Sequence, residues 1–324
     1  MRRDRRDRRD EHAIASELAS LSVAEIVDAA GLRGAPSAVR RFVEALAQVP
    51  SRRLGDRLAR FDADVAAHGL TVAARSVMRA FGARVEVVGR APASGAVLVI
   101  TNHPGAYDSL ATMTALGRDD VALVASERPF LRAMPHVSEH LVFVADSRTR
   151  GGAVARAAGL RAALAWLGAG RVLVQYGAGA IEPDLRFAAA GDEVLGAWSA
   201  GTGVMVDRAL KMGASIVPAL VSGVHSARAK RLPFVRWAER RGITTIAPLV
   251  QATLPGFSDV QIMVRIGAPL AGDALAALAN ETTHAARTAR MRAAVEALAP
   301  TSFGRGPSAM LKQVEAQGPS APGD

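Results

Sequence analysis

The 324-residue sequence contains no cysteine, few aromatic residues and no long apolar run. The absence of cysteine excludes disulfides, a thiol nucleophile and cysteine-based zinc sites. Aromatic residues make up only 4% of the chain, so alanine, valine and leucine must fill the core. No stretch reaches the roughly 18–20 apolar residues of a transmembrane helix, and no apolar segment follows the basic start as in a signal peptide. The sequence therefore predicts a chain without a membrane-spanning segment.

Several motifs of well-known enzyme classes are incomplete. Residues 196–201 miss the Gly-x-Ser-x-Gly pattern of serine hydrolases by one place. Residues 177–179 lack the third glycine of a dinucleotide-binding fingerprint. His136, Glu139 and His140 have the spacing of two metal ligands on a helix, but in the wrong order and with no further ligand downstream. We therefore expect no metal site and no bound cofactor.

The formal net charge is +10, and two segments of the chain are especially rich in basic residues. Residues 1–11 repeat arginine and aspartate without an apolar face, which predicts a disordered basic arm. In the second segment basic residues alternate with Phe234 and Trp237, a combination typical of a bilayer interface, although an amphipathic connector explains it equally well. No nucleic-acid-binding module accompanies either segment, so the expected partner is an anionic membrane surface and not nucleic acid. The basic residues of the second segment are Arg228, Lys230, Arg231, Arg236, Arg240 and Arg241.

The first part of the chain, residues 12–82, has a helical pattern throughout. Ser22 to Glu25 resembles a capping box that would begin a helix. Apolar residues recur every three or four positions in 37–46 and again in 51–68, where Gly69 would end the helix. We expect an N-terminal helical module.

Beyond residue 83, apolar strands alternate with helical segments. This order predicts an α/β domain over residues 83–300, with a largely parallel sheet flanked by helices. The serine, glycine and proline content after Pro300 predicts a flexible tail over 301–324. The expected strands are 85–88, 96–100, 121–125, 141–144, 171–175, 215–221 and 260–266.

The most informative segment directly follows the second of these strands and runs from Thr101 to Ser109. On an uninterrupted helix, five residues turn roughly 500°, which would leave His103 and Asp108 about 140° apart. The two side chains can meet if His103 lies in the turn, Pro104 opens the next helix and Asp108 reaches back. A carboxylate bonded to one imidazole nitrogen fixes the tautomer and leaves the other nitrogen to accept a proton. The segment therefore predicts a general base.

The order of elements from about Val85 to Val224 resembles that of the glycerolipid (glycerol-phosphate and lysophospholipid) acyltransferase family. That family carries Asn-His-x4-Asp after a strand, a Phe-Val/Ile-Asp-Arg block, a strand ending in Phe-Pro-Glu-Gly-Thr-Arg, and an apolar strand with Val-Pro. The corresponding blocks of this chain are Asn102–Asp108, Phe143–Arg148, Val172–Pro183 and Ile216–Pro218.

The resemblance implies that His103, held by Asp108, deprotonates a hydroxyl of an acceptor. The alkoxide then attacks the thioester of acyl-coenzyme A or of an acyl-carrier protein, which are co-substrates and not cofactors. Asn102 or amides of the turn would hold the oxyanion. A protein of this kind would be cytoplasmic and would bind to the inner face of the membrane.

The third block departs from the family pattern. The family has a glutamate and an arginine there that help to bind the phosphate of the acceptor. When the block is aligned on Gly179, Ala178 and Ile181 occupy those two positions. Glu182 is the candidate to replace the lost carboxylate, although a glutamate before a proline is also a common loop residue.

The second block departs as well. Asp146 occupies the position of the family's arginine, and Arg148 fits only after a slip of two residues. An aspartate repels a phosphate that an arginine would bind. We therefore expect an acceptor without that phosphate, such as a lyso-lipid or another hydroxyl compound, with Arg148 and Arg150 as candidate head-group ligands.

Two other interpretations remain open. The chain can be a conventional lysophosphatidate acyltransferase, or a non-catalytic lipid- or acyl-binding protein on the same scaffold. The intact His103 and Asp108 argue against the second, because a binding protein does not need a proton-transfer pair.

Overall fold

The computed structural model describes residues 2–29, 31–34, 36–144, 152–188, 193, 195–241, 243, 246–254, 256–257 and 260–300. The predictions made for Asp146, Arg148, Arg150 and the tail 301–324 lie outside these residues.

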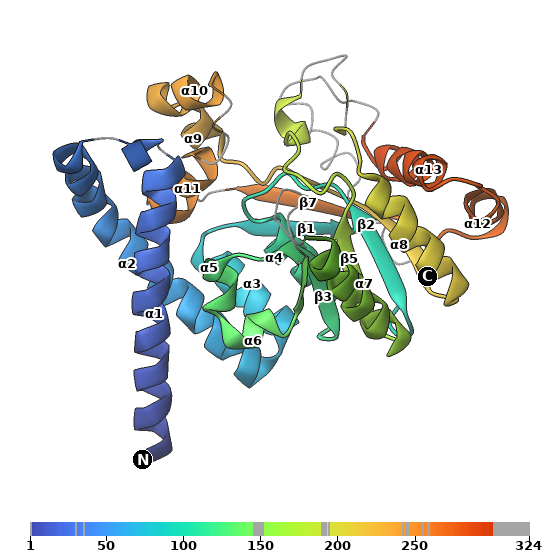
Figure 1. Cartoon of the computed structure of the whole chain (residues 1–324), viewed down its shortest axis with the longest axis horizontal. Coiled ribbons are helices and arrows are strands. Elements are labelled where there is room, and N and C mark those ends of the chain that lie inside the picture. The colour runs from blue at the N-terminus through green and yellow to red at the C-terminus, as the bar shows by residue number, and fades with distance from the viewer. Residues whose placement is uncertain are drawn as a thin grey trace, which may run out of the picture.

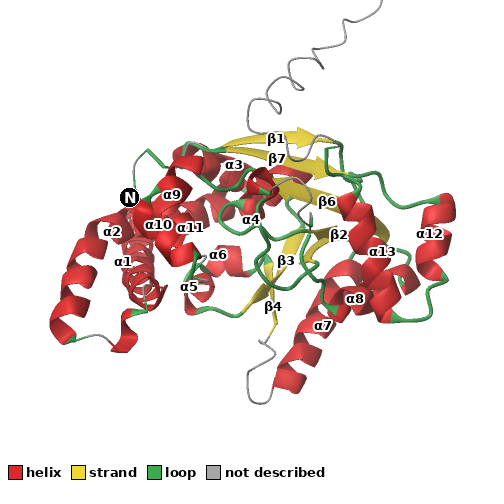
Figure 2. Ribbon diagram, turned by 90° about the horizontal axis from the view of Figure 1, so that it is seen from above, coloured by secondary structure: helices red, strands yellow, loops and turns green. Residues whose placement is uncertain are grey.

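The described chain forms a seven-stranded sheet with the order β1-β7-β6-β2-β5-β3-β4. Neighbouring strands are parallel except for β6 and β7, which are antiparallel. The prediction of a largely parallel sheet flanked by helices is thus confirmed, and β2 lies at the centre of the sheet (Figure 2). The strands are β1 (Arg84–Val88), β2 (Val97–Thr101), β3 (Val121–Ser126), β4 (Leu141–Val144), β5 (Val172–Tyr176), β6 (Ser215–Ser222) and β7 (Gln261–Ile266).

Helices cover both faces of the sheet, as Figures 1 and 2 show. The helices are α1 (Arg2–Ala29), α2 (Ser37–His68), α3 (Leu70–Ala80), α4 (Asp108–Leu116), α5 (Pro129–Arg132), α6 (Pro135–Ser138), α7 (Gly152–Gly168), α8 (Ala200–Lys211), α9 (Ala227–Arg231), α10 (Pro233–Glu239), α11 (Ile246–Thr253), α12 (Gly272–Ala279) and α13 (His284–Glu296). Two short 3₁₀ helices complete the set, η1 (Leu32–Gly34) and η2 (Leu185–Phe187).

The central strand shows why this sheet needs two helical layers. Val97 and Val99 belong to the core cluster that includes residues of α2, α3 and α4. Leu98 and Ile100, which alternate with them, belong to the cluster formed with α7, α8 and α13. Successive side chains of a strand point to opposite faces, so a strand that is apolar at every position is buried on both sides.

The N-terminal helices differ from the prediction at two places. Residues 37–68 form one helix through Pro50, where we expected two. The missing N–H of a proline weakens a helix interior, but here α1 packs closely along α2. A Cβ on Gly55 would lie 2.4 Å from the carbonyl oxygen of Ala15. Tertiary packing of this kind overrides the local preference for a break.

The prediction of a disordered arm over residues 1–11 is wrong, because α1 begins at Arg2. Arginine favours helices, and the repeat places opposite charges four residues apart at Arg3/Asp7, Asp4/Arg8 and Arg6/Asp10, a helix-stabilising spacing. Ser22 does not cap a helix either. It lies inside α1, where its hydroxyl donates to the carbonyl oxygen of Leu18 at 2.8 Å.

The N-terminal helices share one core with the sheet. Leu18, Leu58 and Met78 pack in the same cluster as Val97 and Val99. The buried carboxylate of Asp62 on α2 also accepts a hydrogen bond from the backbone N–H of Val137 at 2.8 Å. No helix in the described ranges is long and apolar enough to cross a membrane.

Candidate active site

The predicted catalytic segment lies where three parallel strands end together. β2 is paired with β5 on one side and with β6 on the other. His103 comes two residues after β2, while Gly177 and Gly223 directly follow β5 and β6. The carboxyl ends of parallel strands are the common position of ligand sites in α/β folds.

A tight turn between β2 and α4 brings His103 back to Asp108. Gly105 has φ +83° and Ala106 has φ +51°, both in the left-handed region. For alanine this conformation is strained by roughly 1–2 kcal/mol, and the turn is held by the N–H of Gly105, which donates to Asp108 Oδ2 at 2.8 Å. The expected helix start at Pro104 is therefore wrong, because α4 begins at Asp108 itself.

The expected meeting of His103 and Asp108 is present. His103 Nδ1 lies 2.7 Å from Asp108 Oδ2. A carboxylate only accepts hydrogen bonds, so neutral His103 carries its proton on Nδ1. Its Nε2 has no hydrogen-bond partner among the described residues, and the side chain is 27% exposed against 2% for Asp108. The arrangement leaves Nε2 as an accessible base.

The second carboxylate oxygen of Asp108 is also engaged. Ser109 Oγ donates to Oδ1 at 3.1 Å, and the hydroxyl of Tyr176 lies 2.7 Å from Ser109 Oγ. The Tyr176 ring stacks on the imidazole of His103, with ring centroids 4.1 Å apart. Burial and the nearby charge of Asp108 raise the pKa of Tyr176 well above its ordinary value, so it remains a neutral phenol. These contacts fix both members of the pair.

The pKa of His103 is raised above its ordinary value of 6.5. Burial of the imidazole acts in the opposite direction and lowers the pKa. The hydrogen bond and charge of Asp108, together with the charge of Glu182, outweigh it. A base with a raised pKa accepts a proton more readily.

Glu182 lies behind the catalytic turn, where its carboxylate is buried. Oε2 accepts from the backbone N–H of His103 at 2.9 Å, and Oε1 accepts from Gly196 N and from Trp198 Nε1, both at 3.0 Å. The carboxylate that was expected to replace a substrate ligand is thus occupied by the protein. Glu182 is a positioning residue for His103.

Asn102 is fully buried, and its side chain joins β2 to β6. Nδ2 donates to the carbonyl oxygen of Val221 at 2.8 Å, and Oδ1 accepts from Val221 N at 2.7 Å. The regular pairing of the two strands ends at Ile100 and Pro218. The amide of Asn102 therefore continues the ladder just before His103, instead of facing the site as an oxyanion ligand.

The third block forms the rim of the site. Gly179 has φ +65°, and its N–H donates to the Tyr176 carbonyl at 3.2 Å, in the turn after β5. Ile181 is 50% exposed and lies over the catalytic turn, where a Cβ on Gly105 would be 3.5 Å from Ile181 Cγ2. An apolar side chain thus lies beside Gly105 of the catalytic turn, where the resemblance implies an arginine.

Two buried residues near the site were not expected from the sequence. Asp184 accepts hydrogen bonds from the backbone N–H groups of Gly223, His225 and Arg186 at 2.8, 3.0 and 3.1 Å. Both ring nitrogens of buried His225 are without a hydrogen-bond partner in the described chain. The only signal for His225 was its place just after a predicted parallel strand.

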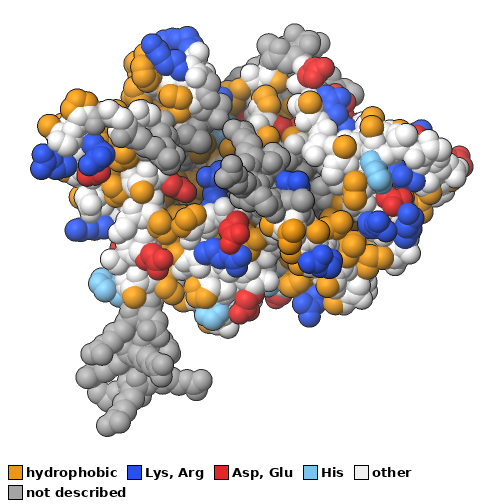
Figure 3. Space-filling model, in the orientation of Figure 1, with side chains coloured by type: hydrophobic (Ala, Val, Ile, Leu, Met, Phe, Trp, Pro, Cys, Tyr) orange, Lys and Arg blue, Asp and Glu red, His pale blue; other side chains and the backbone are white. Residues whose placement is uncertain are grey.

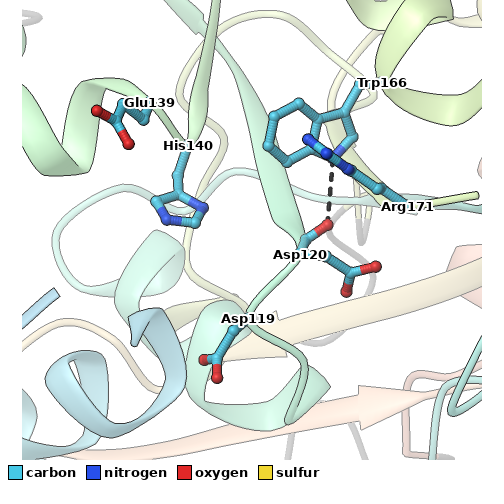
Figure 4. Close-up of a pocket in the computed structure, with 6 residues that line it drawn as sticks. All are labelled: Asp119, Asp120, Glu139, His140, Trp166 and Arg171. Carbon is cyan, nitrogen blue, oxygen red and sulfur yellow. Dashed lines mark hydrogen bonds between the residues drawn. The ribbon is translucent and has the colours of Figure 1, made fainter. Parts of the chain in front are cut away.

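A pocket of about 530 Å³ lies at the opposite edge of the sheet, where β3, β4 and β5 begin (Figure 4). Polar side chains that line this pocket are hydrogen-bonded to backbone carbonyl groups at the start of the strands. Trp166 Nε1 donates to the carbonyl oxygen of Asp120, and His140 Nδ1 lies 2.9 Å from that of Val121. Within the described ranges, no group of three or more histidine, aspartate or glutamate residues is arranged to hold a metal ion.

The fold and the site define an α/β protein with a histidine–aspartate pair at the carboxyl edge of its central strand. No protein-family model matches the sequence, and no curated protein matches it significantly. Among solved structures, the chain is similar to the crystal structure of the 1-acyl-sn-glycerophosphate (LPA) acyltransferase PlsC from Thermotoga maritima. The identity is 13% and the TM-score 0.42, over 91% of this chain and 96% of that one. A similarity at this level carries no information about the reaction.

Proposed function

We propose that the protein is an acyltransferase that moves a fatty acyl group from a thioester to a hydroxyl group of a lyso-lipid or related acceptor. The observation that carries the proposal is the 2.7 Å contact between His103 Nδ1 and Asp108 Oδ2, together with an accessible and unpaired Nε2. The donor is acyl-coenzyme A or an acyl-carrier protein.

In the proposed reaction His103 Nε2 accepts the proton of the acceptor hydroxyl. The alkoxide attacks the thioester carbonyl, and the tetrahedral intermediate expels the thiolate, which takes the proton back from His103. Asp108 stabilises the imidazolium that forms between the two steps. General-base catalysis of this type contributes about 10²- to 10⁴-fold to the rate.

The rim of the site supports an acceptor without a phosphate at that position. Ile181 presents an apolar, half-exposed side chain beside Gly105, and Ala178 adds no charge. Neither position offers a phosphate a cationic partner, and a charged group desolvated without one is costly. A conventional lysophosphatidate acyltransferase is therefore the less favoured candidate.

We also propose that the protein acts at the anionic inner face of a membrane. Basic and hydrophobic side chains gather over α10, at the upper left of Figure 3. Phe234 and Trp237 of that helix are 52% and 48% exposed, and Arg241 lies over the Trp237 ring at 4.1 Å from its centroid. The first half of α2, in the same region of the view, exposes Phe42 and Leu46. Aromatic, aliphatic and basic side chains together suit a lipid interface.

The reaction is tested by thiol release from a panel of acyl-coenzyme A and acyl-carrier-protein donors, with and without lyso-lipids. Acceptor-dependent release is expected from the wild type and from the control His68→Ala, which changes an exposed histidine. We expect His103→Ala to lose about 10²- to 10⁴-fold in rate. Equal rates in wild type and His103→Ala would overturn the proposal. A His103→Ala protein that folds normally and keeps its full biological activity would support the lipid-binding alternative.

A further inference from the structure

A second pocket lies between the 3₁₀ helix η2 and the helices α9 and α10, with a volume of about 350 Å³. Its lining residues are Arg186, Phe187, Ala227, Lys230, Arg231 and Arg236. We propose that this pocket binds the phosphorylated adenosine of coenzyme A, which would make the donor a coenzyme A thioester and not a carrier protein. The proposal deepens, and rests on, the proposed acyl transfer at His103.

The pocket concentrates positive charge from two separate segments of the chain. Four of its six lining residues are cationic, and they come from η2, α9 and α10. Lys230 forms one ion pair, with Glu239 at 3.4 Å. Arg186, Arg231 and Arg236 form no ion pair with any residue in the described ranges. Three unpaired guanidinium groups around a concave surface are suited to bidentate binding of phosphate oxygens.

Phe187 gives the pocket an exposed aromatic surface in addition to its cationic groups. Its side chain is 39% exposed, in a protein with few aromatic residues, and Lys230 Nζ lies 4.6 Å from the centre of its ring. An exposed aromatic ring beside cations can stack on a nucleobase while the cations bind its phosphates. The volume falls within the range of small-molecule sites, whereas a carrier protein needs a broad docking surface.

The chain places this pocket close to the catalytic turn but separate from it. Glu182 binds the backbone of His103, and Arg186 lines the pocket four residues later. Four residues span at most about 14 Å. Asp184, between them, ties the segment to Gly223 and His225 at the end of β6.

The backbone N–H of buried His225 donates to Asp184, two residues before Arg186 of the basic pocket. Burial is the largest cause that lowers the pKa of His225. The charge of Asp184 raises this pKa, that of Lys230 lowers it and that of Asp108 raises it. A single imidazole is thus near enough to sense Lys230 from the pocket and Asp108 from the catalytic pair. In coenzyme A the phosphopantetheine arm separates the nucleotide from the thioester, whereas the phosphate of a lyso-lipid lies only a few bonds from its hydroxyl. A separated pocket therefore fits the donor better than the acceptor.

The test is a direct titration of the full-length protein with 3′-phospho-ADP, the nucleotide of coenzyme A, by calorimetry. Arg186→Ala/Arg231→Ala should raise Kd by about tenfold or more, because two charge-assisted contacts are lost. Phe187→Leu, which keeps the bulk but removes the ring, should raise it about fivefold or more. The control Arg240→Ala/Arg241→Ala removes the same charge from the end of α10 outside the pocket and should leave Kd unchanged. Thermal unfolding of every variant confirms that it is folded.

The other ligands give contrasting outcomes. Glycerol 3-phosphate that binds through Arg186 and Arg231 while 3′-phospho-ADP does not would assign the pocket to the acceptor and overturn the proposal. Acyl-carrier protein that binds through these residues in place of the nucleotide would overturn it as well. The proposal would also be overturned if the wild type did not bind 3′-phospho-ADP, or if Arg186→Ala/Arg231→Ala bound it as tightly as the wild type.

Binding of the nucleotide does not require turnover. His103→Ala should therefore bind 3′-phospho-ADP like the wild type. Pocket-dependent binding without thiol release in the wild type would contradict the proposed reaction and leave the pocket assignment standing. In the active enzyme the double variant should raise KM for acyl-coenzyme A and leave kcat unchanged.

Discussion

Glu182 and His103 are joined in both directions through the catalytic turn. The carboxylate of Glu182 accepts from the His103 N–H at 2.9 Å, and the Glu182 N–H donates to the His103 carbonyl at 2.7 Å. A buried charge thus holds the backbone of the proposed base, although 79 residues separate the two in sequence.

Glu182→Gln should shift the pH dependence of the reaction. The charge of Glu182 raises the pKa of His103, so its removal lowers that pKa and moves the acid limb of kcat/KM to lower pH. Glutamine has only one acceptor oxygen for three donors, which should also reduce the free energy of unfolding by about 1–3 kcal/mol. The control Glu86→Gln changes an exposed residue of β1. A loss of stability with an unmoved acid limb would show that Glu182 is structural only.

Asp108→Asn should slow the reaction and shift its acid limb further. The base must be neutral to act, and its raised pKa places the limb of the wild type above pH 6.5. Without the hydrogen-bonded charge of Asp108, burial dominates and the limb moves to lower pH, while the plateau rate falls by about 10²-fold or more. Profiles of kcat/KM between pH 5 and 9, with Asp56→Asn as an exposed control, measure both effects. An Asp108→Asn limb at or above that of the wild type would contradict the assignment of His103 as the base.

Asn102→Ala should lower the free energy of unfolding, because Asn102 joins two strands and does not face the site. It leaves the N–H and the carbonyl of Val221 without their partners in a fully buried position. Each unsatisfied buried group costs about 1–3 kcal/mol, so the two groups together should lower the free energy of unfolding in urea by about 2–6 kcal/mol. Asn280→Ala, at an exposed position after α12, is the matched control. A change as small as that of the control would disprove the role of Asn102 between β2 and β6.

Arg240→Gln/Arg241→Gln should weaken binding to vesicles that contain anionic lipid. Each basic residue near the headgroups contributes about 1 kcal/mol, so the double variant should lose roughly 30-fold in affinity. Sedimentation with vesicles of phosphatidylserine and phosphatidylcholine measures the loss. Arg84→Gln/Arg208→Gln removes the same charge from exposed positions on β1 and α8 and should have little effect. Equal binding by both double variants would contradict a membrane surface at α10.

The elements of the α/β domain were predictable because their signals are local. Strands such as Val97–Thr101 and Val172–Tyr176 are mostly apolar, and the end of α2 at Gly69 follows from a glycine with φ +83°. The secondary-structure predictions were wrong where tertiary packing outweighs the local sequence preference. We expected two helices over 37–46 and 51–68 and disorder in the charged repeat, but residues 37–68 form one helix and α1 begins at Arg2.

The candidate site divides in the same way. The pairing of His103 with Asp108 follows from five residues of sequence with Pro104 and Gly105 between them. The roles of Asn102 and Glu182 did not follow, because their partners lie 119 and 79 residues away. Asp184 and His225 were missed for the same reason, since only the folded sheet brings the ends of β5 and β6 together.

The sequence by itself determined the alternation of strands and helices, the proposed base and its carboxylate, because neighbouring residues specify these through backbone geometry and side-chain period. Only the tertiary structure decided that Glu182 and Asn102 hold the turn from behind. It also decided that Ile181 covers its rim and that η2, α9 and α10 enclose a basic pocket near it. Those relationships depend on which strands lie side by side, and burial of the whole sheet between two helical layers, not any local pattern, sets that order.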